Sequence, residues 1–261
     1  MSYRYWVVDA FTDTLFAGNP AAVMLPEAPL PEALMRSIAA ENNLSETAFA
    51  VREEGGWHLR WFTPTVEVQL CGHATLATSF VLARLGFAGP FHFRTLSGQV
   101  TAVVEDGRIV LDFPIRARRP EKATAPLVEI LGVDPIDVFY AKDIVAVLPS
   151  AEAVRALAPD IARIKSELPG GALVVTAAGA GDADTTSRYF APGYGIDEDP
   201  VTGGIHTALV PYWAERLGRA ALVCDQASAR GGRLWCEDRG DRVRLAGNAV
   251  LYAEGTLALN A

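Results

Sequence analysis

A long stretch of the chain, residues 72–86, has a helical pattern and is apolar on nearly all sides. A helix of this kind is enclosed by other elements, so the pattern predicts a helix wrapped by a curved sheet. Residues 204–218 form a second stretch of the same kind, and a glycine ends each of the two. Pro211 lies inside the second stretch and is expected to kink that helix.

The segments around these two helices repeat as well. The sequence RWFTP at residues 60–64 precedes the first helix, and RYFAP at residues 188–192 precedes the second. Glu105 and Glu237, each followed by aspartate, come at the same offset after the glycine that ends each helix. Several matches in a common order indicate an internal duplication. Each half is expected to contain strands, a short amphipathic helix, more strands, the long helix and closing strands.

The duplication predicts an α+β fold of two pseudo-symmetric halves. The first half is expected to comprise residues 1–116 with 247–261, and the second residues 117–246. The Pro-rich, basic stretch 114–126 is the natural linker between them. The final segment has no counterpart in the first half, so we expect it to cross back and complete that half's sheet. The pattern is not the alternating βαβ of a doubly wound fold, and no Gly-x-Gly-x-x-Gly motif follows a strand.

Composition narrows the choice of partners and compartment. Half of the 261 residues are hydrophobic, and 23 basic against 31 acidic residues give a net charge of −8, which argues against nucleic acid or an anionic membrane. No apolar run approaches the roughly 20 residues that span a bilayer. The first residues resemble a strand and not a signal peptide, and three cysteines make no disulfide framework, which fits a cytoplasmic protein. The four histidines lack metal-ligand spacing, so no metal is expected.

Both long helices begin in glycine-containing turns, Cys71-Gly72-His73 and Thr202-Gly203-Gly204. A helix start presents unpaired N–H groups and about half a positive charge, which suits a carboxylate. Tight turns alone explain such glycines when each turn is taken singly, but their recurrence in both halves favours a function. We therefore expect a small anionic substrate, bound in a cleft between the halves.

Motifs spread over almost the whole chain carry a family resemblance. They are Asp9–Thr12, Phe16–Val23, Asn43–Phe49, Arg60–Pro64, Cys71–Thr75, Thr95–Gly98, Phe190–Pro192, Glu198–Gly203, His206 and Gly247–Val250. Together they make the chain resemble the PhzF family, phenazine-biosynthesis-type isomerases that share the diaminopimelate epimerase fold. The resemblance implies a barrel-like mixed sheet around a central helix in each half. It also implies a homodimer and a site without metal, flavin or nicotinamide.

The resemblance assigns roles to particular residues. Glu46 matches the general acid/base of the family, and His73 and Asp199 match the polar residues that assist it. The helix dipole at the start of residues 72–86 is expected to lower the pKa of His73 and favour a neutral imidazole. His206 is expected to be a core or supporting residue. The substrate-binding candidates are Asn19, Ser45, Gly72, Ser97, Thr202, Gly203 and Gly204.

The sequence thus predicts a cofactor-independent isomerase or epimerase of a small carboxylate-bearing metabolite, with proton transfer through Glu46. One alternative is an inactive binding or regulatory protein of the same fold, supported by Gly204, where the family commonly has serine. Another is a racemase that uses Cys71. The duplication aligns Cys71 with Gly203, and Cys224 and Cys236 fall in closing strands, so a second thiol is missing.

Overall fold

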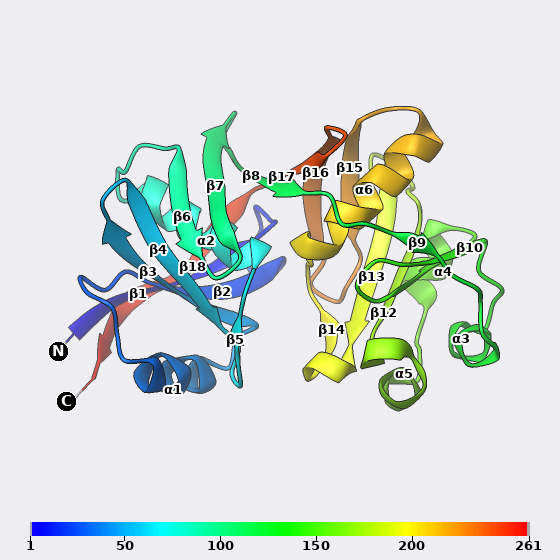
Figure 1. Cartoon of the computed structure of the whole chain (residues 1–261), viewed down its shortest axis with the longest axis horizontal. Helices are drawn as coiled ribbons and strands as arrows, with labels where there is room; N and C mark the ends of the chain where they lie inside the picture. Colours follow the sequence, from blue (N-terminus) through cyan, green and yellow to red (C-terminus); the bar gives the residue numbers. More distant parts are fainter. Residues whose placement is uncertain (1, 260–261) are drawn as a thin grey trace. The chain divides into compact units, whose positions relative to one another are not determined.

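The computed structural model describes residues 2–259, which form two compact units. The first unit takes in the chain up to Phe113 together with the segment from Arg244 onward, and the second is Pro114–Val243. The architecture is the α+β fold that the sequence predicts, with a curved mixed sheet around a long helix in each unit (Figure 1).

The first unit encloses helix α2 within its sheet (Figure 1). Its helices are α1 (Glu32–Asn42) and α2 (Gly72–Arg84). Its strands are β1 (Ser2–Ala10), β2 (Asn19–Met24), β3 (Glu46–Glu53), β4 (Gly56–Phe62), β5 (Glu67–Val68), β6 (Phe91–Thr95), β7 (Gly98–Glu105), β8 (Arg108–Pro114) and β18 (Ala249–Ala258). Strand β18 pairs antiparallel with β1, so the end of the chain completes this sheet.

Helix α2 is buried on nearly all sides, as its apolar pattern predicts. Nine of its residues between His73 and Leu82 are buried, and the strands β1, β2, β3, β7 and β18 contact it. The helix ends at Arg84, two residues earlier than expected, and Gly86 follows in a left-handed conformation with φ of 87°. The sheet therefore fixes the position of the helix start, where Cys71, Gly72 and His73 lie.

Helix α1 connects the parallel strands β2 and β3. Parallel neighbours need a crossover connection, and α1 supplies it by packing Met35 and Ile38 against the outer side of the sheet. Asn43 ends the helix in a left-handed conformation with φ of 50°, and its N–H donates to Ala39. The chain then turns and enters β3 at Glu46, which pairs with Ala21 of β2.

The second unit repeats this plan. Its helices are α3 (Ala125–Leu131), α4 (Ala151–Ala156), α5 (Ile161–Glu167) and α6 (Gly203–Leu217), with single 3₁₀ turns η1 (Pro169–Gly171) and η2 (Pro192–Tyr194). Its strands are β9 (Arg119–Pro120), β10 (Asp137–Tyr140), β11 (Ile144–Val147), β12 (Leu173–Ala178), β13 (Thr185–Ala191), β14 (Ile196–Asp199), β15 (Ala221–Gln226) and β16 (Gly232–Asp238). Strand β17 (Arg242–Gly247) follows β16 along the chain and runs past the end of this unit.

Strand pairing shows the same order of connections in both units. The parallel pair β2 and β3 corresponds to β11 and β12, and in each case helices form the crossover. The parallel pair β4 and β6 corresponds to β13 and β15, and each pair brackets a short strand and the long helix. The antiparallel pairs β1–β2 and β10–β11 also correspond. The duplication read from sequence is thus also present in the topology.

Three local expectations need correction. The stretch 114–126 is not a plain linker, because it contains β9 and the first turn of α3, which Thr124 caps by accepting a hydrogen bond from the N–H of Leu127. Asp199, expected in the loop that begins the second long helix, is instead the last residue of strand β14, which pairs with β13. Helix α6 begins at Gly203, one residue earlier than expected, and it continues through Pro211 to a C-cap at Gly218.

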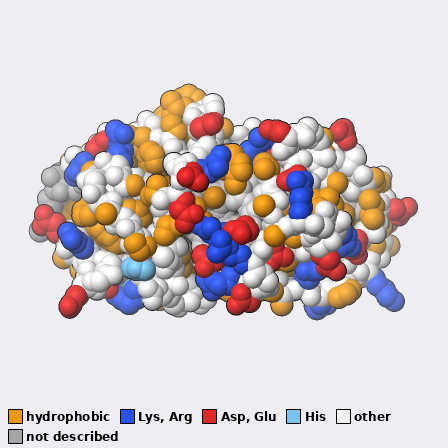
Figure 2. Space-filling view, turned by 90° about the horizontal axis from the view of Figure 1, so that it is seen from above, with side chains coloured by type: hydrophobic (Ala, Val, Ile, Leu, Met, Phe, Trp, Pro, Cys, Tyr) orange, Lys and Arg blue, Asp and Glu red, His pale blue; other side chains and the backbone are white. Residues whose placement is uncertain are grey.

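The surface in Figure 2 carries basic and acidic side chains close to one another. Ion pairs such as those of Arg163 with Glu129 and Glu167 have this character, at 2.8 and 2.7 Å. Within residues 2–259, no helix combines the length and the apolar character that a membrane crossing requires.

Candidate active site

Two residues expected to act together lie in contact in the first unit. Glu46 is the first residue of β3, and His73 is the second residue of α2. Glu46 Oε2 lies 3.1 Å from His73 Nε2, and the two side chains are only 17% and 6% exposed. Both atoms are buried, and neither has a well-aligned hydrogen bond to any described residue. The pair is therefore held at contact distance with its hydrogen-bonding capacity unused.

Cys71 adds a third side chain to this pair. It is the N-cap residue of α2, and its Sγ lies 3.5 Å from Nδ1 of His73. The imidazole therefore has sulfur at one ring nitrogen and a carboxylate at the other. The three residues form a chain of contacts in the order Cys71, His73, Glu46.

The contacts of His73 with Cys71 and Glu46 change its expected protonation. Burial opposes protonation of the ring, but the interactions with Cys71 and with Glu46 outweigh it and raise the pKa of His73 well above its ordinary value. The expectation of a lowered pKa is thus wrong. Burial, reinforced by the charge of Glu46, raises the pKa of Cys71 to about 11. Cys71 is a neutral thiol at pH 7, so the charge that acts on His73 there is that of Glu46.

The same three residues offer ligand atoms within 4.8 Å of one another, the spacing of a metal site. A metal ion would have to meet both the sulfur and the carboxylate at a single imidazole nitrogen. In this structure Cys71 faces Nδ1 and Glu46 faces Nε2. The arrangement matches a linear hydrogen-bonding chain better than a shared coordination centre.

The other candidate residues of the first unit are Ser45, Gly72, Asn19 and Ser97. Ser45 directly precedes Glu46 and is half-buried, and Gly72 is the first residue of α2. Asn19 is fully buried at the start of β2, two residues before Ala21, the partner of Glu46. Ser97 is exposed in the turn between β6 and β7, where its hydroxyl lies 3.1 Å from that of Thr95.

The second unit brings together Asp199, Thr202 and the first residues of α6. The Thr202 hydroxyl donates to Asp199 Oδ2 at 2.5 Å, across the turn that leads from β14 into the helix. Gly203 is buried and Gly204 half-buried in the first turn of α6. A Cβ atom added at Gly204 would meet no heavy atom within 4 Å, so a serine fits there.

Two buried side chains, Gln226 and His206, hold this turn in place. Gln226, only 1% exposed at the end of β15, accepts a hydrogen bond from the N–H of Thr202 and donates to the carbonyl of Asp199, both at 2.8 Å. His206 Nδ1 lies 2.8 Å from the carbonyl of Thr202, and burial lowers the pKa of His206 to about 4. His206 is therefore the supporting residue that the sequence suggested. Gln226 was missed, because nothing next to it in the sequence marks it.

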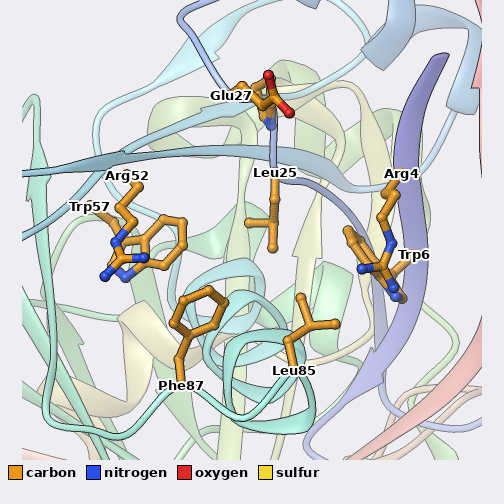
Figure 3. A pocket seen from close by; sticks show the side chains of 9 residues that line it. Arg4, Trp6, Leu25, Glu27, Arg52, Trp57, Leu85 and Phe87 are labelled. Carbon is orange, nitrogen blue, oxygen red and sulfur yellow. The ribbon is translucent and has the colours of Figure 1, made fainter.

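A pocket of about 370 Å³ lies elsewhere in the first unit (Figure 3). Its lining residues are Arg4, Trp6, Leu25, Pro26, Glu27, Arg52, Trp57, Leu85 and Phe87. Leu85 is the C-cap of α2, whereas Cys71 is its N-cap, and a helix of 13 residues is about 20 Å long. The pocket is therefore separate from the contact between Glu46 and His73.

Comparison with known proteins settles the family. The model of the phenazine biosynthesis-like proteins, PhzC-PhzF, matches residues 8–255. The chain belongs to this family. An uncharacterized isomerase of Pseudomonas aeruginosa is 48% identical to it over 264 residues, with 100% of each chain covered. A crystal structure of a PhzF family protein from Enterococcus faecalis is 43% identical, with a TM-score of 0.95 and coverage of 99% of this chain and 100% of that one.

A more distant likeness extends the fold beyond the PhzF family. The structure of a hydroxyproline epimerase from Agrobacterium vitis is 12% identical, with a TM-score of 0.59 and coverage of 100% of this chain and 93% of that one. At this identity the likeness concerns the fold alone. The PhzF family and its relatives named as isomerases make this chain an isomerase or epimerase.

Proposed function

We propose that this PhzF-family isomerase moves a proton within a small carboxylate-bearing metabolite, that Glu46 carries the proton, and that the reaction needs no cofactor. The contact of Glu46 Oε2 with His73 Nε2 at 3.1 Å supports the proposal best. A proton carrier has to lie within hydrogen-bond reach of its partners and to be shielded from bulk water. Glu46 and His73 satisfy both conditions.

In the proposed reaction, Glu46 removes a proton from a carbon acidified by a neighbouring carboxylate or conjugated system. It then returns that proton to another carbon of the substrate, which is an isomerisation. An epimerisation needs a second proton donor on the opposite face of the same carbon. The imidazole of His73 hydrogen-bonds to the carboxyl group and offsets the charge that develops beside it. The N–H groups at the start of α2, beginning at Gly72, bind the anionic group of the substrate.

The roles of the second unit follow the family resemblance. Asp199 is proposed to assist proton transfer, and Thr202, Gly203 and Gly204 to bind substrate. The space around Gly204 is large enough for the serine side chain that the family commonly has there. Glycine in place of that serine therefore removes a hydroxyl group without changing the fold. A homodimer and a cytoplasmic location remain predictions.

Cys71 is a poor candidate for the proton carrier. A thiol acts as a base or nucleophile in its thiolate form, and a pKa of about 11 leaves roughly one molecule in ten thousand ionised at pH 7. Its sulfur also faces His73 Nδ1, on the other ring nitrogen from Glu46. These observations favour Glu46 over the racemase alternative.

The decisive experiment follows solvent deuterium into substrate. Small carboxylates that raise the melting temperature of the protein are incubated with it in deuterated water, and incorporation is measured by NMR. We expect Glu46→Gln to keep fold and ligand binding but to lose exchange by about 10²- to 10⁴-fold, the usual contribution of a general acid/base. Glu41→Gln is the matched control, because Glu41 is exposed on α1.

The two variants separate the possible outcomes. Full exchange by Glu46→Gln rejects the glutamate as proton carrier. Binding without exchange by the wild-type protein supports the alternative of an inactive binding protein.

A further inference from the structure

Cys71 occupies a position where side chains usually serve the helix. N-cap residues are mostly Ser, Thr, Asp or Asn, whose oxygen accepts a hydrogen bond from a free N–H of the first turn. Cys71 has the extended backbone of an N-cap, with φ of −140° and ψ of 112°, but its side chain makes no capping hydrogen bond. Its carbonyl instead accepts from the hydroxyl of Thr75 at 2.6 Å. The sulfur faces Nδ1 of His73, and the backbone N–H of Ala74 in the first helical turn also acts on it.

The surroundings of the sulfur make His73 its polar partner. Cys71 is 6% exposed and His73 is 5% exposed, so neither side chain has ready access to water. The sulfur lies 3.5 Å from Nδ1, within the reach of a hydrogen bond to sulfur. A buried imidazole nitrogen without a partner is costly, and the thiol meets that need.

We propose that Cys71 is a positioning residue, which holds the imidazole of His73 with Nε2 directed at Glu46. This inference rests on the proposed function, since it concerns how the acid/base pair is kept in register. It assigns Cys71 no bond to substrate and no part in carrying the proton.

The chemistry of a thiol suits this task in both states of the ring. When His73 is neutral with its proton on Nε2, the S–H of Cys71 donates to Nδ1. When His73 is cationic, Nδ1–H donates to the sulfur, which is a weak acceptor. In both states Nε2 carries a proton and is the ring nitrogen that lies 3.1 Å from Glu46.

Rotation of the ring is the motion that the thiol restrains. The outer torsion of a histidine side chain has a broad, nearly two-fold profile, so an unrestrained ring samples both orientations. Only one of them places Nε2 at 3.1 Å from Glu46. Loss of the sulfur contact therefore reduces the fraction of molecules in which the pair is aligned.

Three substitutions at Cys71 test this role. Cys71→Ser keeps a group that both donates and accepts. Cys71→Val fills the space of the sulfur, with one carbon atom more, but removes the polar atom, and Cys71→Ala removes both. The protonation and tautomer of His73 are read in the free protein from the ¹⁵N shifts of its ring, assigned with a His73→Gln variant. Exchange of substrate deuterium gives kcat and KM.

We expect Cys71→Ser to retain the His73 nitrogen shifts and most of kcat. Cys71→Val and Cys71→Ala should both move the Nδ1 and Nε2 resonances and lower kcat about ten-fold or more with little change in KM, since small misplacements of reacting groups are costly. In a His73→Gln background the same substitutions should have no further effect on kcat. An equal loss of kcat in Cys71→Val and Cys71→Ala shows that the polar contact matters and that packing does not.

The proposal is overturned if Cys71→Val and Cys71→Ala leave the ring shifts and kcat as in the wild type. This result is separable from a failure of the proposed function. The NMR measurement needs no turnover, so it decides the role of Cys71 even if Glu46→Gln proves fully active.

Discussion

Gln226 offers the sharpest test of how the second unit is built. The substitution Gln226→Ala removes a buried amide that joins the two ends of the turn between β14 and α6. The amide accepts from the N–H of Thr202 and donates to the carbonyl of Asp199, each at 2.8 Å, and also donates to the Thr202 hydroxyl at 3.2 Å. All three bonds disappear together in the alanine variant.

The magnitude follows from these contacts. A hydrogen bond inside a protein contributes about 0.5–1.5 kcal/mol net, so the three bonds together contribute about 1.5–4.5 kcal/mol. Gln226 is 1% exposed, so the truncation also leaves a small void. Asp199 and Thr202 are half-buried, and water replaces part of what they lose. We therefore expect the free energy of unfolding to fall by about 2–4 kcal/mol.

Urea denaturation measures this loss. Gln69→Ala is the control, because Gln69 is exposed in the loop that follows β5 in the first unit. The control should change the unfolding free energy by less than about 0.5 kcal/mol. Gln226→Glu removes the donor for Asp199 and places a buried, unpaired carboxyl group against that carbonyl, so it should be at least as destabilising as alanine. A Gln226→Ala variant as stable as the control would show that the amide does not clamp the turn.

Three further predictions follow from single positions. Gly18 has φ of +65°, and a Cβ atom there would lie 2.2 Å from the Ala10 carbonyl oxygen. Gly18→Ala should therefore lower the free energy of unfolding by about 3 kcal/mol or more in urea denaturation. The control Gly55→Ala, at a position with positive φ but open space, should lower it by about 1–2 kcal/mol. Gly204→Ser should leave stability within about 0.5 kcal/mol of wild type, and a large loss in urea denaturation would contradict the open space at that position. Burial lowers the pKa of His206 to about 4 from an ordinary 6.5, so the unfolded chain takes up this proton first. Its contribution to stability is complete above pH 6.5 and falls by up to about 3 kcal/mol as the pH drops to 4, and His206→Asn should flatten that part of a pH series of urea denaturations.

The sequence predicted the elements whose signals are local. The apolar pattern of residues 72–86 gave an enclosed helix, and the repeat of segments gave the repeated strand pairing of the two units. The prediction of Glu46 and His73 came from family motifs, and the structure brings the two into contact. Asp199 was expected in the loop that begins the second long helix, but it is the last residue of strand β14. The strand forms because β14 pairs with β13, and Arg188 binds Glu198 through two hydrogen bonds at 2.8 and 3.0 Å.

The misses depend on distances that the sequence does not contain. Gln226 reaches the turn before α6 because β15 lies parallel to β13, a pairing between segments far apart in the chain. The pKa of His73 was predicted in the wrong direction because only the helix start was considered. A helix end carries about half a charge spread over several N–H groups. The carboxylate of Glu46, 3.1 Å from the buried ring of His73, has a larger effect on the pKa than the helix end.

The duplication places a buried histidine near the start of each long helix, and the two have opposite electrostatics. His73 contacts the carboxylate of Glu46, and its pKa is raised. Among the described residues, the polar partner of His206 is the neutral carbonyl of Thr202, and the pKa of His206 is lowered. A ring that stays neutral suits a fixed support, while a ring coupled to a carboxylate suits a group that handles protons. Under the proposed function, the same scaffold therefore supplies one helix start for proton transfer and another that holds a turn in place, and the side chains next to each histidine make the difference.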